Sequence, residues 1–138
     1  MRVMVLVKAT EDTERGILPT TDEFAEMGAY NEQLVNAGIM LAGDGLRPTS
    51  HAKRVRFDAD AKTVLDGPFT ETKELVAGYW IWEVASMDEA VEWLKRAPFG
   101  GGAEVELRPF YTPEDFGEAF TPELQEREDQ LRARTGQA

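Results

Sequence analysis

Apolar side chains in two segments, residues 2–8 and residues 76–84, alternate with a period of two, which predicts β-strands. In both segments the intervening positions are apolar as well, so each strand requires cover on both of its faces. In the second segment, Trp80 and Trp82 point to one face, and Tyr79 and Ile81 point to the other. These two segments are the best candidates for the centre of a sheet.

Two segments between the predicted strands have the spacing of helices. Thr20 and Glu23 form a capping box at the start of the first helix, and Gly38 ends it. Its expected inner face consists of Phe24, Met27, Tyr30 and Leu34. The second helix begins after a capping box at Ser86 and stops at Pro98.

The remaining regular elements are shorter. Residues 39–42 and 103–110 predict two more strands, and residues 53–66 predict a β-hairpin. A charged C-terminal helix begins at Thr121, with proline at its first position. The order of elements is βαββαβ with an inserted hairpin, which predicts an α+β fold of the ferredoxin-like type.

In this topology both helices cover the same face of an antiparallel sheet, so the other face stays open within one chain. A second copy packed face to face would close it and give a dimeric α/β barrel. Alternatively, residues 112–134 fold back over the open face of their own chain. We expect residues 1–110 to form the domain and residues 111–138 to form a helical extension.

Composition limits the possible partners. The chain has 138 residues and no cysteine, and its formal net charge is −11. The length suits one compact domain, and the lack of cysteine excludes disulfides and thiol chemistry and favours a cytoplasmic location. The negative charge disfavours binding to nucleic acid. No apolar run approaches the ~20 residues that span a bilayer, so no membrane segment is expected.

The segment Asp66-Gly67-Pro68-Phe69 breaks the alternation between the hairpin and the strand that follows. Glycine permits backbone conformations closed to other residues, and proline fixes its own φ and removes a hydrogen-bond donor. An aspartate at the start of such a turn commonly accepts hydrogen bonds from the backbone. Asp66 is therefore either a cap of this turn or a group that carries chemistry.

The residues from Asp66 to Glu74, followed by Gly78-Tyr79-Trp80, resemble the DGPF signature of YCII-related proteins. Residues 89–93 and 104–109 resemble the second helix and last strand of the same family, and the resemblance covers roughly residues 1–110. It implies a dimeric α/β barrel with no generally assigned reaction. Members of the family are often encoded beside alternative sigma factors, so the resemblance also implies an accessory role with a regulatory protein partner.

The better-understood relatives carry a His-Asp pair, with the histidine on the first helix and the aspartate before the aromatic residue that follows the second. This chain has no histidine in residues 20–37, and Ala97 precedes Pro98-Phe99. Its one histidine, His51, lies in a predicted loop and is more typical of solvated surface than of a catalyst. With one histidine and no cysteine, the sequence specifies no metal site, and no cofactor is expected.

The candidate site residues are polar and aromatic side chains near the motif and the central strands. Asp66 is the candidate base, and Lys73 or Arg108 would polarise a substrate oxygen. The residues expected to bind a ligand are Arg47, Phe69, Tyr79 and Arg108. For Glu71 and Glu74, a surface salt-bridge cluster is the favoured interpretation.

Two functions from different classes follow. The first is a small-molecule-binding or regulatory homodimer without an assigned reaction, and the missing His-Asp pair favours it. The alternative is an enzyme that uses acid–base chemistry in a cleft at the sheet or the dimer seam, with Asp66 as its base.

Overall fold

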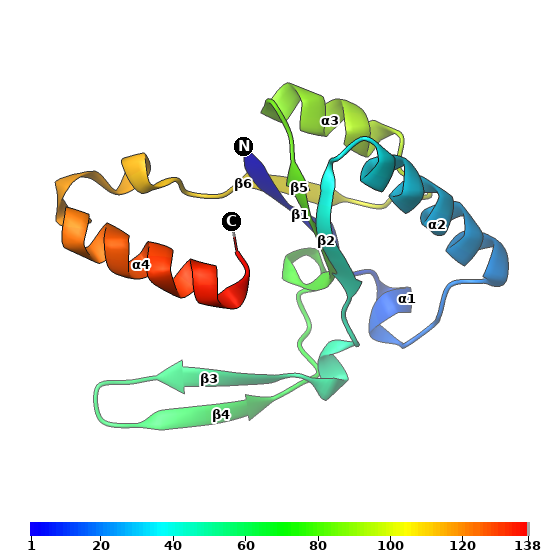
Figure 1. Ribbon diagram of the computed structural model, residues 1–138. Coiled ribbons are helices and arrows are strands. Elements are labelled where there is room, and N and C mark those ends of the chain that lie inside the picture. The colour runs from blue at the N-terminus through cyan, green and yellow to red at the C-terminus, as the bar shows by residue number, and fades with distance from the viewer. Residues whose placement is uncertain (138) are drawn as a thin grey trace.

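The computed structural model describes residues 1–137 and contains a four-stranded antiparallel sheet in the order β2-β5-β1-β6 (Figure 1). Its strands are β1 (Arg2–Lys8), β2 (Met40–Gly45), β5 (Val76–Glu83) and β6 (Val105–Pro109). Two helices cross over between strands, α2 (Thr21–Asn36) and α3 (Met87–Lys95). This order and pairing confirm the predicted α+β, ferredoxin-like fold.

The hydrophobic core lies between the sheet and these two helices. Val3 and Val5 of β1 and Trp82 of β5 are fully buried there, together with Leu34 of α2 and Ala90 of α3. The pairing of Val3 with Trp82 and of Val5 with Trp80 places these side chains on one face. The predicted division of the β5 side chains between two faces is confirmed.

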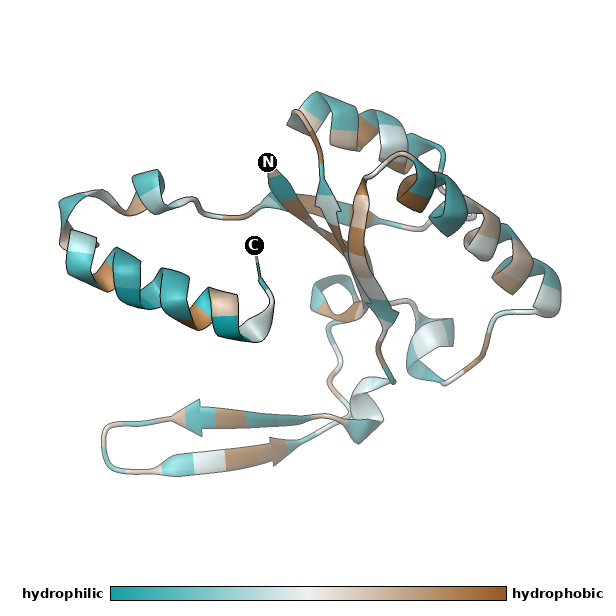
Figure 2. Cartoon of the chain, viewed as in Figure 1, coloured by the Kyte–Doolittle hydropathy of each residue, from teal (hydrophilic) through white to brown (hydrophobic). Residues whose placement is uncertain are grey.

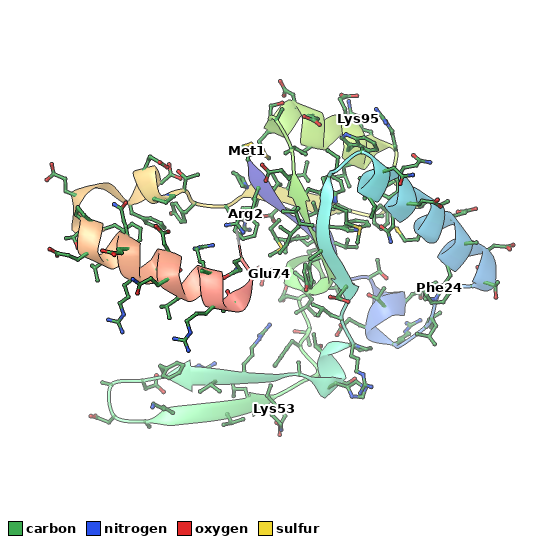
Figure 3. All side chains as sticks on the ribbon, viewed as in Figure 1. Met1, Arg2, Phe24, Lys53, Glu74 and Lys95 are labelled. Carbon is green, nitrogen blue, oxygen red and sulfur yellow. The ribbon has the colours of Figure 1, made fainter. Side chains whose placement is uncertain are left out.

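The inner face of α2 was predicted with one error. Tyr30 and Leu34 are buried and Met27 packs against the core, but Phe24 is 60% exposed. Phe24 lies in the first turn of α2, at the end of the helix that extends past the sheet (Figure 3). The 3.6-residue period identifies a face of the helix but not how far along its length the sheet reaches.

Local sequence sets the beginnings of the helices. The Thr20 side chain accepts from the backbone N–H of Glu23, and the Glu23 side chain accepts from that of Thr20, which completes the predicted capping box. Ser86 caps α3 by accepting from the N–H of Glu89, but the Glu89 side chain accepts from the N–H of Ala85 instead of Ser86, so the second predicted capping box forms only in part. A short helix, α1 (Glu11–Glu14), was not predicted and is capped by Thr10.

Burial of Tyr30 leads to a testable pH dependence. Its hydroxyl donates to the carbonyl oxygen of Trp93 at 2.6 Å, and burial raises the pKa of Tyr30 from 10.0 to about 12, against a smaller opposing effect of Arg96. The unfolded chain therefore ionises first as the pH rises, and stability is lost between pH 10 and 12. We expect Tyr30→Phe to lower the free energy of unfolding by about 1 kcal/mol at pH 7.

Chemical denaturation of the wild type and Tyr30→Phe from pH 7 to pH 12 measures this effect. The difference between the two proteins should shrink above pH 10. Tyr111→Phe is the matched control, because the Tyr111 side chain is 73% exposed. A constant difference across the whole range would contradict the assignment.

The predicted hairpin forms a separate two-stranded sheet that projects from the body (Figure 1). Its strands are β3 (Lys53–Phe57) and β4 (Lys62–Asp66), which are joined in register from Lys53–Asp66 to Phe57–Lys62. Every residue of β3 is exposed. Figure 2 shows hydrophobic positions on the hairpin strands as well as in the central sheet.

The chain beyond β6 forms what we call the C-terminal arm, residues 111–137. It contains the 3₁₀ segment η3 (Pro113–Ala119) and the helix α4 (Pro122–Thr135), which Thr121 caps as predicted. Neither element has a buried residue, and α4 makes no extensive contact with the sheet. The alternative in which residues 112–134 fold back over the open face of their own chain is therefore wrong.

Within residues 1–137, no helix has the length and apolar character required to cross a membrane.

Candidate functional site

The face of the sheet opposite α2 and α3 is the first candidate site. Met4 and Leu6 of β1 lie on it beside Ile81 and Tyr79 of β5, and Ala42 of β2 is paired with Ile81. All five residues are only half-buried. We call this surface the open face; it is a continuous apolar strip along three adjacent strands.

Charged groups border the open face on the side of β6. Lys8 Nζ lies 3.2 Å from Glu106 Oε1, and Arg108 Nε donates to Glu106 Oε2 at 2.6 Å. Along β1 and β6 the open face carries three cations, Arg2, Lys8 and Arg108, and the single carboxylate of Glu106. This half of the face therefore has a positive balance in a chain whose net charge is −11.

Glu106 has a lowered pKa, chiefly through the hydrogen bond from Arg108 and then through that from Lys8. In the folded chain the pKa of Glu106 lies below its ordinary value of 4.5. The contribution of the Glu106 carboxylate to stability is therefore complete above pH 4.5 and is lost as the pH falls through the lowered pKa. We expect Glu106→Gln to lower the melting temperature slightly at pH 7 and to match the wild type in strong acid.

Thermal unfolding from pH 7 to pH 2 checks this prediction. Glu92→Gln is the matched control, since Glu92 forms an exposed pair with Lys95 on α3. A Glu106→Gln protein that remains less stable than the wild type in strong acid would contradict it.

At the opposite side of the open face, the Tyr79 hydroxyl donates to Asp44 Oδ2 at 3.4 Å. Tyr79 and Arg108 were both predicted to bind a ligand, and the structure places both on the open face. They lie on strands on either side of β1, where Leu6 pairs with Tyr79 and Met4 pairs with Arg108. An aromatic ring and a guanidinium flanking an apolar row can accommodate a planar or apolar anion.

The open face continues into a groove of about 680 Å³ at the C-terminal arm. Arg2, at the start of β1, faces the arm (Figure 3), and its guanidinium lies 4.7 Å from the centre of the Phe110 ring. On the arm, the rings of Tyr111, Phe116 and Phe120 stack in sequence, with centroids 4.9 and 5.6 Å apart. From α4 the groove receives Glu128, Asp129 and Arg132, with Arg132 Nε 3.4 Å from Glu128 Oε1.

The DGPF turn has a structural role that involves a distant loop. A Cβ at Gly67 would lie 1.7 Å from the carbonyl oxygen of Thr49, so only glycine fits this close approach. The Phe69 N–H donates to Thr49 Oγ at 3.0 Å, and Thr49 in turn donates from its hydroxyl and its N–H to the Glu14 carboxylate. We call this arrangement of Gly67, Phe69, Thr49 and Glu14 the Thr49 clasp; it fastens the base of the hairpin to the body.

The structure distributes the other predicted site residues over separate elements. The Asp66 side chain is 72% exposed and accepts from Lys53 Nζ at 2.6 Å, across the hairpin. Lys73 is exposed in the short 3₁₀ segment η2 (Thr72–Glu74), and Arg47 is exposed in the loop after β2. Phe69 is half-buried under the guanidinium of Arg54, at 3.6 Å.

Between the sheet and the helices, aromatic side chains fill the space. The Trp80 ring lies about 6 Å from the rings of Tyr30, Trp82 and Phe99, with centroid separations of 6.0, 5.8 and 6.1 Å. Trp80 Nε1 donates to Asn31 Oδ1 at 2.9 Å. This side of the sheet is therefore core. Among residues 1–137, no group of three acidic or histidine side chains is arranged to hold a metal ion.

Sequence reasoning missed the Thr49 clasp and the arm groove. Glu14 precedes Thr49 by 35 positions, and no local spacing connects them. The aromatic residues of the arm did give a signal, because Tyr111, Phe116 and Phe120 recur at four- and five-residue intervals in an otherwise acidic segment.

This chain is similar to a protein family and to known proteins. A family model described as the YCII-related domain matches residues 1–111. An uncharacterised protein of Rhizobium meliloti (strain 1021) is 34% identical over 92 residues, which cover 64% of this chain and 74% of that protein. A solved structure of 5-chloro-2-hydroxyhydroquinone dehydrochlorinase from Burkholderia phenoliruptrix AC1100, in complex with 2,5-dihydroxybenzoquinone, is similar with 21% identity and a TM-score of 0.43, over 83% of this chain and 98% of that one.

Proposed function

The chain belongs to the YCII-related domain family, and on that premise we propose that it is a homodimeric binding protein whose two open faces enclose a small molecule. The observation that carries the proposal is the half-buried apolar strip of the open face, bordered by Tyr79 on one side and Arg108 on the other. Contiguous apolar surface of this kind marks an interaction site on a soluble protein.

A second copy is the partner that fits the open face best. Sheets that pack face to face bury the inner side chains of both layers, and a two-fold axis lets one patch serve both copies. The C-terminal arm of the same chain leaves the face half-exposed. Met4, Leu6 and Ile81 would then form a second core, on the side of the sheet opposite the first.

The charges of the open face indicate the class of ligand. Arg108 and Lys8 outnumber Glu106 on this part of the face, so one positive charge remains to be balanced. Tyr79 offers a ring for stacking and a hydroxyl that already binds a carboxylate. A small carboxylate with an aromatic or apolar body satisfies both features.

Ligand binding can be tested with a panel of small aromatic and aliphatic carboxylates. We expect at least one to raise the melting temperature of the wild type, since a ligand at about 100 times its Kd stabilises the folded state by about 2.7 kcal/mol. Arg108→Gln should lower the affinity for that ligand by about tenfold or more, because a charge-assisted contact is lost. Lys95→Gln on α3 is the matched control and should leave the affinity for the ligand unchanged. If no compound raises the melting temperature of the wild type, or if Arg108→Gln binds the ligand as tightly as Lys95→Gln does, the proposed site is wrong.

The binding role extends to a regulatory protein partner, which the resemblance to the family implies. A pull-down with the intact chain as bait tests this part. Recovery of the chain alone, together with no thermal shift from any compound, would contradict a binding function altogether.

The enzyme alternative retains Asp66 as the base and Lys73 or Arg108 as the group that polarises a substrate oxygen. It rests on the ionisable groups beside the DGPF turn. A carboxylate becomes a good base near neutral pH when burial favours its protonated form, and Asp66 is 72% exposed and paired with Lys53. We therefore rank this alternative second. Turnover of a panel of lactones, enols and carboxylates that is abolished in Asp66→Asn would reverse the order.

A further inference from the structure

Two parts of the chain project from the core with no cover of their own, the β3–β4 hairpin and the C-terminal arm. The hairpin exposes Val55, Phe57 and Val64, by 50%, 73% and 60%. The arm exposes Tyr111 by 73% and Phe116 by 50% around its groove. A two-stranded hairpin and a single charged helix are each marginally stable in water, so both require packing against another surface.

Each surface carries a charged side chain without an ionic partner. On the hairpin, Lys62 shares a face with Val55, Phe57 and Val64, whereas Arg54 and Arg56 lie on the other face. In the arm groove, Glu128 is paired with Arg132, and Asp129 lines the groove beside them. Among residues 1–137, Lys62 and Asp129 take part in no salt bridge.

The two surfaces also match in form. Val55 pairs directly with Val64, and Phe57 lies two residues along the same face of the hairpin, with Lys62 opposite it. In the arm groove, the stacked rings of Phe116 and Phe120 form the apolar part, and Asp129 lines the groove together with the ion pair of Glu128 and Arg132.

From this complementarity we propose that the apolar face of the hairpin of one copy docks into the arm groove of a second copy, and that the contact is reciprocal. The inference rests on the proposed homodimer. In a two-fold dimer the hairpin of each copy docks into the groove of the other, so two such contacts form at once. The groove is continuous with the open face through Arg2, so the docked hairpin extends the same interface.

The groove is then a composite site. One copy provides the aromatic rings and Asp129, and the other provides the apolar face of the hairpin and Lys62. The contact also gives the arm, which lies outside the residues matched by the family model except for its first residue, a role in the assembly.

The absence of native cysteine allows a direct test by disulfide cross-linking. Val64→Cys lies on the apolar face of the hairpin, and Ala119→Cys lines the groove. Both substitutions replace a small side chain with another small one. When the two single variants are mixed and mildly oxidised, we expect a mixed disulfide between position 64 of one chain and position 119 of the other. It should form about tenfold faster or more than with Ala25→Cys, which lies on the exposed side of α2.

Light scattering on the same samples separates the possible failures. A dimer that forms no faster cross-link than the control overturns the hairpin–groove contact and leaves the sheet-to-sheet dimer intact. A monomer overturns both. The double variant with both substitutions in one chain should give covalent dimers. An intrachain disulfide instead would show that the hairpin docks on its own arm, which also overturns the proposal.

Charge reversal provides a second measurement that does not require cross-linking. Lys62→Glu should weaken dimerisation about tenfold by setting a like charge against Asp129 of the arm. Adding Asp129→Lys to the same chain should restore at least part of the affinity. Loss without any restoration would contradict the pairing of these two surfaces.

Discussion

Gly67→Ala is expected to lower the free energy of unfolding by about 3 kcal/mol or more. For a chain of this length such a loss corresponds to roughly 10 °C in melting temperature. The new Cβ would lie 1.7 Å from the Thr49 carbonyl oxygen and 2.7 Å from its carbonyl carbon. Both are backbone atoms, so no side-chain rotation relieves the overlap. The variant must therefore separate the base of the hairpin from the Thr49 loop.

Separation of these segments also breaks the hydrogen bond from the Phe69 N–H to Thr49 Oγ, and with it the link to Glu14. Thermal and chemical unfolding of the variant measure the loss. Gly28→Ala is the matched control: nothing lies within 4 Å of a Cβ there, and alanine should stabilise α2 by about 1 kcal/mol. Equal stability of Gly67→Ala and the wild type would mean that the Thr49 clasp contributes little to the fold.

The sequence predicts the sheet well because its signal is local. The alternation in residues 2–8 and 76–84 identifies β1 and β5, and their surplus of apolar positions correctly indicates two apolar faces. The hairpin boundaries follow equally from turn chemistry. The short helix α1 escaped prediction because four residues are too few to show a helical period.

The candidate site could be predicted only in part. Tyr79 and Arg108 fall on the open face because strand alternation fixes which side chains share a face. The role of the DGPF turn could not be predicted, because it depends on the Thr49 backbone, 18 positions away from Gly67. Sequence reasoning concentrated on the carboxylate of Asp66, whereas the structure shows that the close contact belongs to the glycine beside it.

Strand register also accounts for the charged residues near the motif. Lys53 and Asp66 pair directly across the hairpin, so Asp66 has a partner that the register provides. An exposed pair of this kind contributes little to stability, on the order of 0–1 kcal/mol. Its more useful effect is to leave Lys62 as the unpaired charge on the apolar face of the hairpin, available to a second surface.

Leu6→Asp is expected to weaken dimerisation by about 1,000-fold, or about 4 kcal/mol, because the carboxylate would be buried between two sheets without a partner. Leu6 lies at the centre of the open face, between Tyr79 on β5 and Glu106 on β6. A carboxylate there would also stand beside the existing charge of Glu106. In the isolated chain the position is half-exposed, so the fold itself should tolerate the change.

Sedimentation velocity over a range of protein concentrations measures this effect, and circular dichroism confirms that the variant is folded. Leu18→Asp is the matched control, since Leu18 is 79% exposed in the segment before α2 and should leave dimerisation unchanged. A folded Leu6→Asp protein that dimerises like the wild type would show that the open face is not the interface. The hairpin and the arm would then have to account for any dimer on their own, and the cross-linking pair Val64→Cys and Ala119→Cys would reveal whether they do.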